Sequence, residues 1–227
     1  MKYYASLLLL VAVLFLAGNC KAQNTKHVIT SAKVVYDVTL VSSENAAAES
    51  VGLEDPIEYT LYFKKAMSRV EMNSGENKIS IISDNLSNKG TMLMDMNGMK
   101  MAMKMDSLSP VKKNGQIVKP VVVITRESKV IAGYLCYKAN VTSVTKSGTK
   151  SYVVWFNSEL KGNYSFDTKV EGVNGLMMEF ESKSDGKVYK MTAKSVDTND
   201  ILSDDLFVVP SDYKKVDKSG FNSGISK

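Results

Sequence analysis

The chain has 227 residues, of which 44% are hydrophobic and 23% charged, and its formal net charge is +5 at pH 7. Its basic residues are lysines except for Arg69 and Arg126. Because arginine is the residue that reads phosphates and bases through paired hydrogen bonds, this composition argues against nucleic-acid binding. With one histidine, His27, and two cysteines, Cys20 and Cys136, the chain also cannot build a zinc site from clusters of these residues.

The first 22 residues are predicted to be a removable signal peptide. Lys2 is followed by an apolar run over residues 5–17 and then by small and polar residues up to Ala22. This is the order of basic start, apolar core and cleavage region in a secretory signal. The apolar run is shorter than the roughly 20 residues of a membrane-spanning helix, and no later stretch is longer. The mature chain is therefore expected in the periplasm or at the outer membrane, with no transmembrane span.

Two processing routes remain open for this signal. Cleavage after Ala22 would release a soluble protein that begins at Gln23. Lipoprotein processing would instead acylate Cys20 and anchor the chain, because residues 16–19 resemble a lipobox stretched by one residue. Asn19, directly before the cysteine, departs from a lipobox. Soluble export is therefore favoured, and Cys20 is the candidate lipidation site of the alternative.

The rest of the chain is predicted to be one β domain between two polar segments. Residues 23–30 form a polar lead-in, residues 31–213 form the domain, and residues 214–227 form a polar tail. Within the domain, apolar residues alternate with polar ones, as in half-buried strands, or form short apolar runs. The clearest early strands are 34–40, 59–63, 70–72 and 79–82.

Two-residue turns set the register of several predicted hairpins. Asp185-Gly186 suits the type I′ turn that joins twisted strands, and Ser147-Gly148 is expected to act in the same way. In these registers apolar residues meet on one face and opposite charges on the other. The predicted cross-strand pairs are Phe180 with Met191, Glu181 with Lys190, and Val141 with Val154.

Long helices are missing from the pattern. Residues 202–207 are expected to form one capped turn, with Ser203 as its N-cap. About ten short strands separated by turns predict a mainly β fold with a single antiparallel sheet, curved or partly closed.

The most unusual stretch is a methionine-rich hairpin over residues 92–105, centred on Asn97-Gly98. With a two-residue turn there, every methionine falls on one face, because residues that oppose each other across antiparallel strands share a face. Asp95 opposes Lys100 on the other face, which is expected to be solvated. The candidate ligand-binding residues, called the methionine row below, are Met92, Met94, Met96, Met99, Met101, Met103 and Met105.

Three interpretations of the methionine row are open. The row can be hydrophobic core, since fully burying each methionine contributes roughly 1.5–3 kcal/mol. It can be a pliable apolar surface for a lipid, an acyl chain or a hydrophobic peptide, because unbranched methionine adapts to varied partners. It can also bind Cu(I), a soft ion that thioethers ligate. In the predicted register, Asp95 and Asp106 point to the other face and cannot assist a metal site.

Other candidate chemistry is weak. Residues 147–150 and 184–187 have Ser-x-x-Lys spacing, but that nucleophile needs its lysine folded toward the serine in a closed cleft. Both matches span predicted turns. Cys136 lies in an apolar strand, where an inert buried thiol is expected. The prediction is therefore no catalytic residue, no metal ligand, no cofactor and no enzyme activity.

Residues 131–139, with the sequence IAGYLCYKA, resemble the IAGYxCxKA signature of an uncharacterised family of secreted bacterial envelope domains. The resemblance covers roughly residues 31–213. Further segments that fit this family are 32–38, 92–105, 153–156 and 202–210.

This resemblance implies a fold like that of the lipoprotein carrier LolA: a curved antiparallel sheet or half-barrel with an apolar concave face and few short helices. In carriers of that kind, the concavity holds lipid chains. The leading hypothesis is a non-enzymatic, exported envelope protein that binds a hydrophobic ligand, a lipid or an acyl chain, through the methionine row. The alternatives are a periplasmic Cu(I)-binding protein and a purely structural or interaction domain.

Overall fold

The computed structural model describes the protein over residues 28–43, 58–87, 89–105, 112–113, 116–117, 119–145, 148–161, 170–184 and 186–217. The predicted signal peptide 1–22, including Cys20, lies outside the described residues, as do His27 and residues 218–227 of the predicted tail. Within the described part of the chain, no helix is long and apolar enough to cross a membrane.

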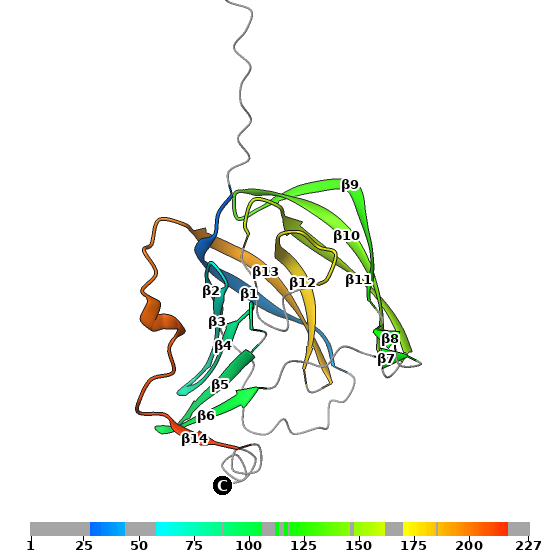
Figure 1. Ribbon diagram of the computed structural model, residues 1–227. Helices are drawn as coiled ribbons and strands as arrows, with labels where there is room; N and C mark the ends of the chain where they lie inside the picture. Colours follow the sequence, from blue (N-terminus) through cyan, green and yellow to red (C-terminus); the bar gives the residue numbers. More distant parts are fainter. Residues whose placement is uncertain are drawn as a thin grey trace, which may run out of the picture.

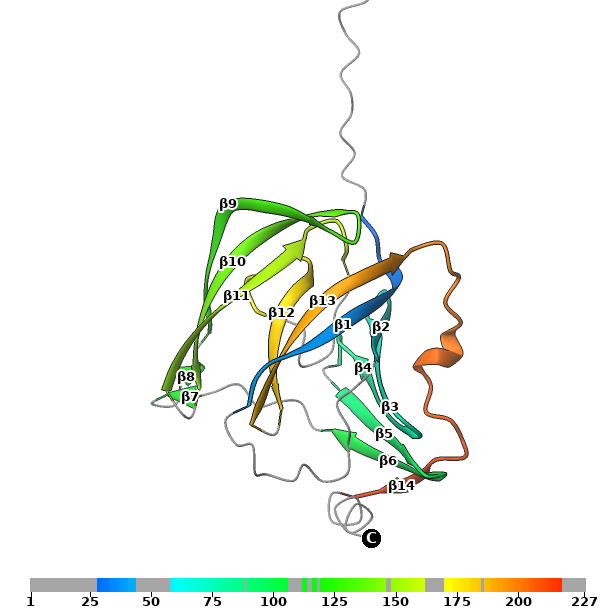
Figure 2. The same ribbon diagram turned by 180° about the vertical axis from the view of Figure 1, so that it is seen from behind.

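The described residues form one open, curved sheet of 12 strands, in the order β14-β6-β5-β4-β3-β2-β1-β13-β12-β11-β10-β9 (Figures 1 and 2). Neighbouring strands run antiparallel, except that β14 runs parallel to β6. A second, two-stranded sheet contains β7 and β8. The strands are β1 Ser31–Ser43, β2 Glu58–Lys64, β3 Met67–Ser74, β4 Asn77–Asp84, β5 Lys89–Met96, β6 Met99–Met105, β7 Lys112–Lys113, β8 Gln116–Ile117, β9 Val121–Ile131, β10 Tyr134–Thr145, β11 Gly148–Asn157, β12 Leu176–Ser184, β13 Lys187–Asp197 and β14 Lys214–Val216.

The predicted fold class, a mainly β protein with a single curved sheet, is confirmed, but the predicted number of about ten strands is too low for a sheet of 12. Strand β14 shows why the alternation of apolar residues predicts too few strands. It belongs to the segment predicted as a polar tail and has one apolar residue, Val216, between lysines and Asp217. Alternation of apolar residues cannot reveal so short a strand.

The hairpin registers are partly as predicted. Strands β12 and β13 pair Phe180 with Met191 and Glu181 with Lys190, which confirms the predicted register of this hairpin. The register predicted from Ser147-Gly148 is wrong, because Val141 pairs with Tyr152 and not with Val154. Gly148 is already the first residue of β11. A shift by two residues leaves every side chain on its predicted face, so the apolar pattern could not detect the error.

The main hydrophobic core lies on the concave face of the sheet. Because the sheet bends round, side chains of β9, β10 and β11 join those of β1, β2 and β3 in one cluster. Tyr36 lies at its centre: its ring meets Tyr59 and Phe180 edge-on at centroid distances of 5.5 and 5.8 Å. Its hydroxyl donates to the backbone oxygen of Met177 at 2.9 Å, which joins β1 to β12.

A second cluster lies on the opposite face of β2 to β6, under the segment that leads to β14. This segment, residues 202–213, is called the C-terminal strap below. It contains the 3-10 helix η1, Asp204–Phe207, which Ser203 caps as predicted by accepting from Asp205 N at 3.2 Å. Phe207 and Leu202 pack against the hairpin from this side. The cluster's buried residues are Ile82, Leu93, Ala102, Leu202 and Phe207.

Candidate functional site

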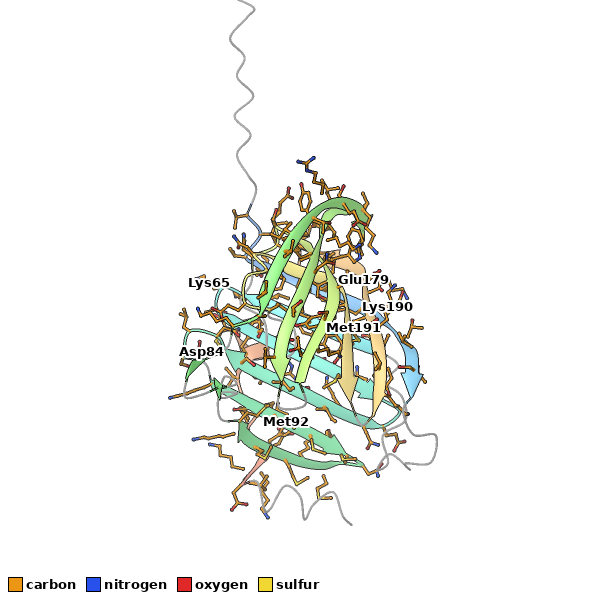
Figure 3. All side chains as sticks on the ribbon, turned by 90° about the vertical axis from the view of Figure 1, so that its right-hand side faces the viewer. Lys65, Asp84, Met92, Glu179, Lys190 and Met191 are labelled. Carbon is orange, nitrogen blue, oxygen red and sulfur yellow. The ribbon has the colours of Figure 1, made fainter. Side chains whose placement is uncertain are left out.

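The methionine row forms on β5 and β6 in the predicted register. Met96 pairs with Met99, Met94 with Met101, and Met92 with Met103. Met105 pairs with Gly90 at the end of the same face. The alternation of the strands places all seven methionines on one face. Figure 3 labels Met92 on this hairpin, at the end of the sheet away from β9.

The methionine row continues the concave face that holds the main core. Across β1 to β5, one line of directly paired residues runs Tyr36, Tyr59, Met72, Ile79 and Met94. Cross-strand partners share a face of the sheet. The row is therefore the outer end of an apolar surface that begins at the aromatic centre of the core.

Burial differs along the methionine row. Met94 and Met101, in the middle, are 3% and 4% exposed, whereas Met99, at the turn, is 46% exposed. The remaining four methionines are half-buried. The middle of the row thus has the burial of core, and the turn end has the accessibility that a binding surface needs.

The opposite face of the hairpin was predicted to be solvated, but part of it is buried. Leu93 and Ala102 are 0% and 4% exposed because they contribute to the cluster under the C-terminal strap. Lys100 contacts Asp95 at 3.9 Å, as its predicted pairing requires, but lies closer to Asp212 of the strap, at 2.7 Å. The hydrogen bond from Lys100 lowers the pKa of Asp212 and raises its own pKa. The strap therefore supports the methionine row from behind.

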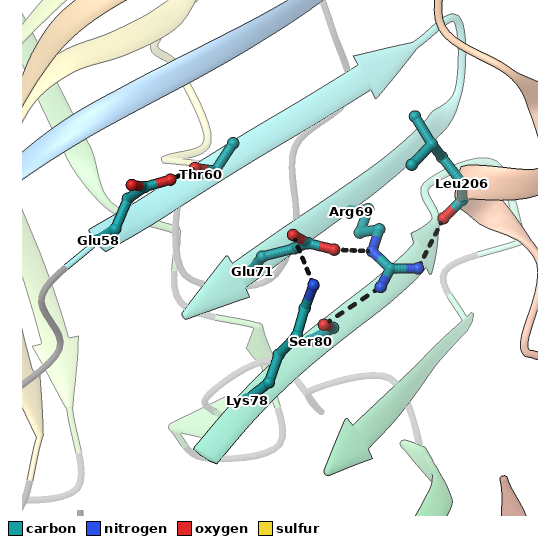
Figure 4. Close-up of polar contacts among 7 residues, drawn as sticks. All are labelled: Glu58, Thr60, Arg69, Glu71, Lys78, Ser80 and Leu206. Carbon is teal, nitrogen blue, oxygen red and sulfur yellow. Dashed lines mark hydrogen bonds and ion pairs between the residues drawn. The ribbon is translucent and has the colours of Figure 1, made fainter. Parts of the chain in front are cut away.

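The strap is held by a polar network that sequence patterns did not reveal (Figure 4). Arg69 of β3 donates from Nε to Glu71 at 2.6 Å and from a terminal nitrogen to the backbone oxygen of Leu206 in η1, at 3.0 Å. Its other terminal nitrogen reaches Ser80 Oγ at 3.4 Å. Lys78 Nζ lies 3.0 Å from the second carboxylate oxygen of Glu71. The Arg69 and Glu71 side chains are 10% and 11% exposed, so this is a nearly buried ion pair.

Of the two Ser-x-x-Lys matches, the serine and the lysine are both described only in the one at residues 184–187. Ser184 and Lys187 are cross-strand partners at the end of the β12–β13 hairpin. Lys150 lies on β11 beside its turn, and Ser147 lies outside the described residues. The match at residues 184–187 therefore spans the connection of a hairpin, as predicted.

A small pocket of about 120 Å³ opens between β11 and β12. The described pairing of these strands is limited to residues 155–157 of β11 and 176–179 of β12, and beyond these pairs the strands separate. No residue of the methionine row contributes to this pocket. Its lining residues are Lys150, Tyr152, Val154, Val170, Met177, Phe180 and Glu181.

No group of three or more histidine, cysteine, aspartate or glutamate residues is placed to hold a metal ion in the described ranges. Thioethers are not among these residues, so the Cu(I) alternative for the methionine row stays a prediction.

Cys136 is fully buried within the main core and donates from Sγ to the backbone oxygen of Tyr134 at 3.3 Å. Burial raises the pKa of this thiol from 9.0 to about 11, because the charged thiolate is disfavoured away from water. Since the thiolate is the reactive form, an inert cysteine is expected, in agreement with the sequence analysis.

The raised pKa of Cys136 predicts a fall in stability at high pH. Between the ordinary pKa of 9.0 and the folded value of about 11, the thiol ionises in the unfolded chain before it does so in the folded one. Stabilisation from this group is complete below pH 9 and decreases as pH rises toward 11. The urea midpoint should therefore fall more between pH 8 and pH 10 in the wild type than in Cys136→Ala. Equal decreases of the urea midpoint in the two proteins would show that Cys136 does not cause this pH dependence.

The comparisons with known proteins bear on the fold. No family model matches the sequence, and no curated protein matches it. A part of PNGF-II shares this fold. One crystal form of PNGF-II, P21, matches 87% of this chain with a TM-score of 0.53 and 14% identity, and another, C2, matches 87% with a TM-score of 0.50 and 15% identity. The chain spans only 34% and 33% of the PNGF-II chains, so the likeness concerns the fold of one part of that protein.

Proposed function

We propose that this protein is a non-enzymatic, exported envelope protein that binds a hydrophobic ligand, a lipid or an acyl chain, on the methionine row. The observation that carries the proposal is the position of the row: seven thioethers continue the apolar concave face to its outer end, where Met99 is 46% exposed. Methionine suits this task because its unbranched, polarisable side chain adapts to flexible apolar partners.

The resemblance to secreted envelope domains with a LolA-like sheet supports the same proposal. In such a sheet the concave side is the side for hydrocarbon chains, and here the methionine row shares that side with Ile79 and Ile81 of β4. The strap lies on the other side, so it backs the row without covering it.

Binding of an uncharged apolar dye tests the proposal. Nile red should bind the wild-type protein saturably, and the double variant Met92→Gln/Met103→Gln should bind it about tenfold more weakly, because two half-buried thioether contacts are replaced by amides. Fluorescence titration gives both affinities. The matched control is Ile201→Gln, which changes a side chain that is 96% exposed and lies outside the strands that carry the row. Unsaturable binding to the wild type, or equal affinities for wild type and double variant, would exclude this site.

Cu(I) binding is the second candidate function, and the cross-strand pairs favour it. Met94 opposes Met101 and Met92 opposes Met103, and directly opposed residues have Cβ atoms about 4.5–5.5 Å apart. Thioethers from both strands can therefore reach one soft ion. The variant Met92→Leu/Met103→Leu separates the two functions, because it keeps an apolar face and removes sulfur. Lipid binding should survive in this variant, whereas Cu(I) affinity measured against a competing chelator should fall if copper is the ligand.

A further inference from the structure

Two buried polar atoms on β4, Ser83 Oγ and Asn77 Oδ1, have no hydrogen-bond partner among the residues that the structure describes. Residues at alternate positions of a strand share a face, so both lie on the face of Ile79 and Ile81, beside the methionine row. Ser83 is only 2% exposed. Most buried polar side-chain atoms in native proteins are paired, so an unpaired one beside a candidate binding surface calls for an explanation.

Ser83 is flanked by small residues on both neighbouring strands. Its cross-strand partners are Ser68 on β3 and Gly90 on β5, so small residues flank it on both sides. Ser68 Oγ accepts from the side chain of Asn85 at 3.2 Å, which leaves Ser83 as the polar atom without a partner at this end of the row. Met105 at the end of the methionine row is therefore in line with Gly90, Ser83 and Ser68, which are small residues.

The concave face of β4 to β6 carries no charged residue. The charged residues of these strands occupy the alternate positions and face the other side. On the concave side an ionised group would lie away from water with no opposite charge beside it, which is costly. The concave-face residues of these strands are Asn77, Ile79, Ile81, Ser83, Gly90, Met92, Met94, Met96, Met99, Met101, Met103 and Met105.

We propose, building on the proposed function, that the methionine row binds an uncharged single-chain amphiphile, whose hydroxyl, ester or amide group hydrogen-bonds Ser83 Oγ. The hydrocarbon chain lies over Met105, Met103 and Met92, the half-buried residues of the row beside Ser83. Ionised fatty acids are disfavoured because no cationic side chain lies on this face.

A series of ligands with one acyl chain and different head groups tests this proposal on the wild-type protein. Monolauroylglycerol, lauramide and laurate at pH 8 are titrated against bound Nile red. The two neutral ligands should displace the dye with an affinity about tenfold or more above that of ionised laurate. Similar affinities for laurate and the neutral ligands would overturn the proposal.

The variant Ser83→Ala tests the hydrogen bond itself. It should weaken binding of the two neutral ligands about three- to tenfold, the range for one hydrogen bond, and leave the affinity for Nile red unchanged. Its melting temperature should not fall, because the hydroxyl that it removes has no partner in the free protein. Ser128→Ala, an exposed serine on β9, is the matched control and should change nothing.

These experiments distinguish the hydrogen bond to Ser83 from hydrophobic binding at the methionine row. If Nile red binds at the methionine row but Ser83→Ala leaves the affinity for monolauroylglycerol unchanged, the amphiphile assignment is wrong and the hydrophobic site stands. If neither the dye nor any lauroyl ligand binds saturably, both are wrong. Should the variant fail to fold, the head-group series on the wild type decides.

Discussion

Replacing Arg69 with methionine is expected to lower the free energy of unfolding by about 3–5 kcal/mol, the range for removing one partner of a buried ion pair. The change leaves the Glu71 carboxylate, only 11% exposed, without its closest cation. It also removes the donor that holds the backbone oxygen of Leu206, and with it a link between β3 and the C-terminal strap. Urea denaturation followed by circular dichroism measures the loss.

Arg126→Met is the matched control. Arg126 is the other arginine of the chain and lies exposed on β9. Its replacement should change the stability by about 0.5 kcal/mol or less, as is usual for a surface position. Similar losses of stability in the two variants would show that the buried contacts of Arg69 contribute no more than those of an exposed arginine.

A double variant separates the ion pair from the strap contact. Arg69→Met/Glu71→Leu removes both charges, so it should recover part of the stability lost in Arg69→Met. It cannot restore the hydrogen bond to Leu206, which Arg69 alone donates from this site. If the double variant is less stable than Arg69→Met, the unpaired carboxylate is not the main cause of the stability lost in the single variant. The lost contact with the strap and the contact between Glu71 and Lys78 are then the cause.

The Arg69 network was missed at the sequence level for a physical reason. Arg69 and Glu71 alternate with Val70 and Met72, so the pattern assigns the two charged side chains to a solvent-facing side. The segment that covers them comes from far along the chain: Arg69 and Leu206 are separated by 137 residues. Local alternation tells which face a side chain takes, but not what will cover that face.

The register of the methionine hairpin and the face that its methionines share were predicted because this information is local. The Asn97-Gly98 turn fixes the register, Asn97 and Gly98 both adopt positive φ, at 50° and 83°, and alternation fixes the face. The two unpaired polar atoms of β4 could not be predicted in this way. Whether Ser83 finds a partner depends on the side chains of β3 and β5 across the sheet, and sequence alone does not determine their hydrogen bonds.

Replacing Gly175 with alanine is expected to destabilise the protein by about 2–4 kcal/mol, more than a typical overpacked position. A Cβ at this position would lie 2.0 Å from the backbone oxygen of Asn157 and 3.0 Å from Cα of Ser158. Both contacts are with backbone, which cannot move aside as a flexible side chain can. Urea denaturation of the variant gives the value.

Gly75→Ala is the control for this variant. Gly75 has a positive φ of 56°, but a Cβ there would meet nothing within 4 Å. The cost should therefore be about 1–2 kcal/mol, the penalty for the left-handed backbone alone. A Gly175 variant no less stable than the Gly75 variant would mean that the two backbones are not in close contact.

The effect of Gly175→Ala should also be local, because of where this glycine lies. The residue directly precedes β12, and the next residue, Leu176, donates to the backbone oxygen of Leu160 at 3.1 Å. The described pairing of β11 with β12 covers only residues 155–157 and 176–179, so this short junction joins β9, β10 and β11 to the rest of the sheet. Hydrogen exchange should therefore quicken more in β9 to β11 than in β2 to β6. Uniform loss of protection would show that the two parts of the sheet open together and that the junction is not their weak point.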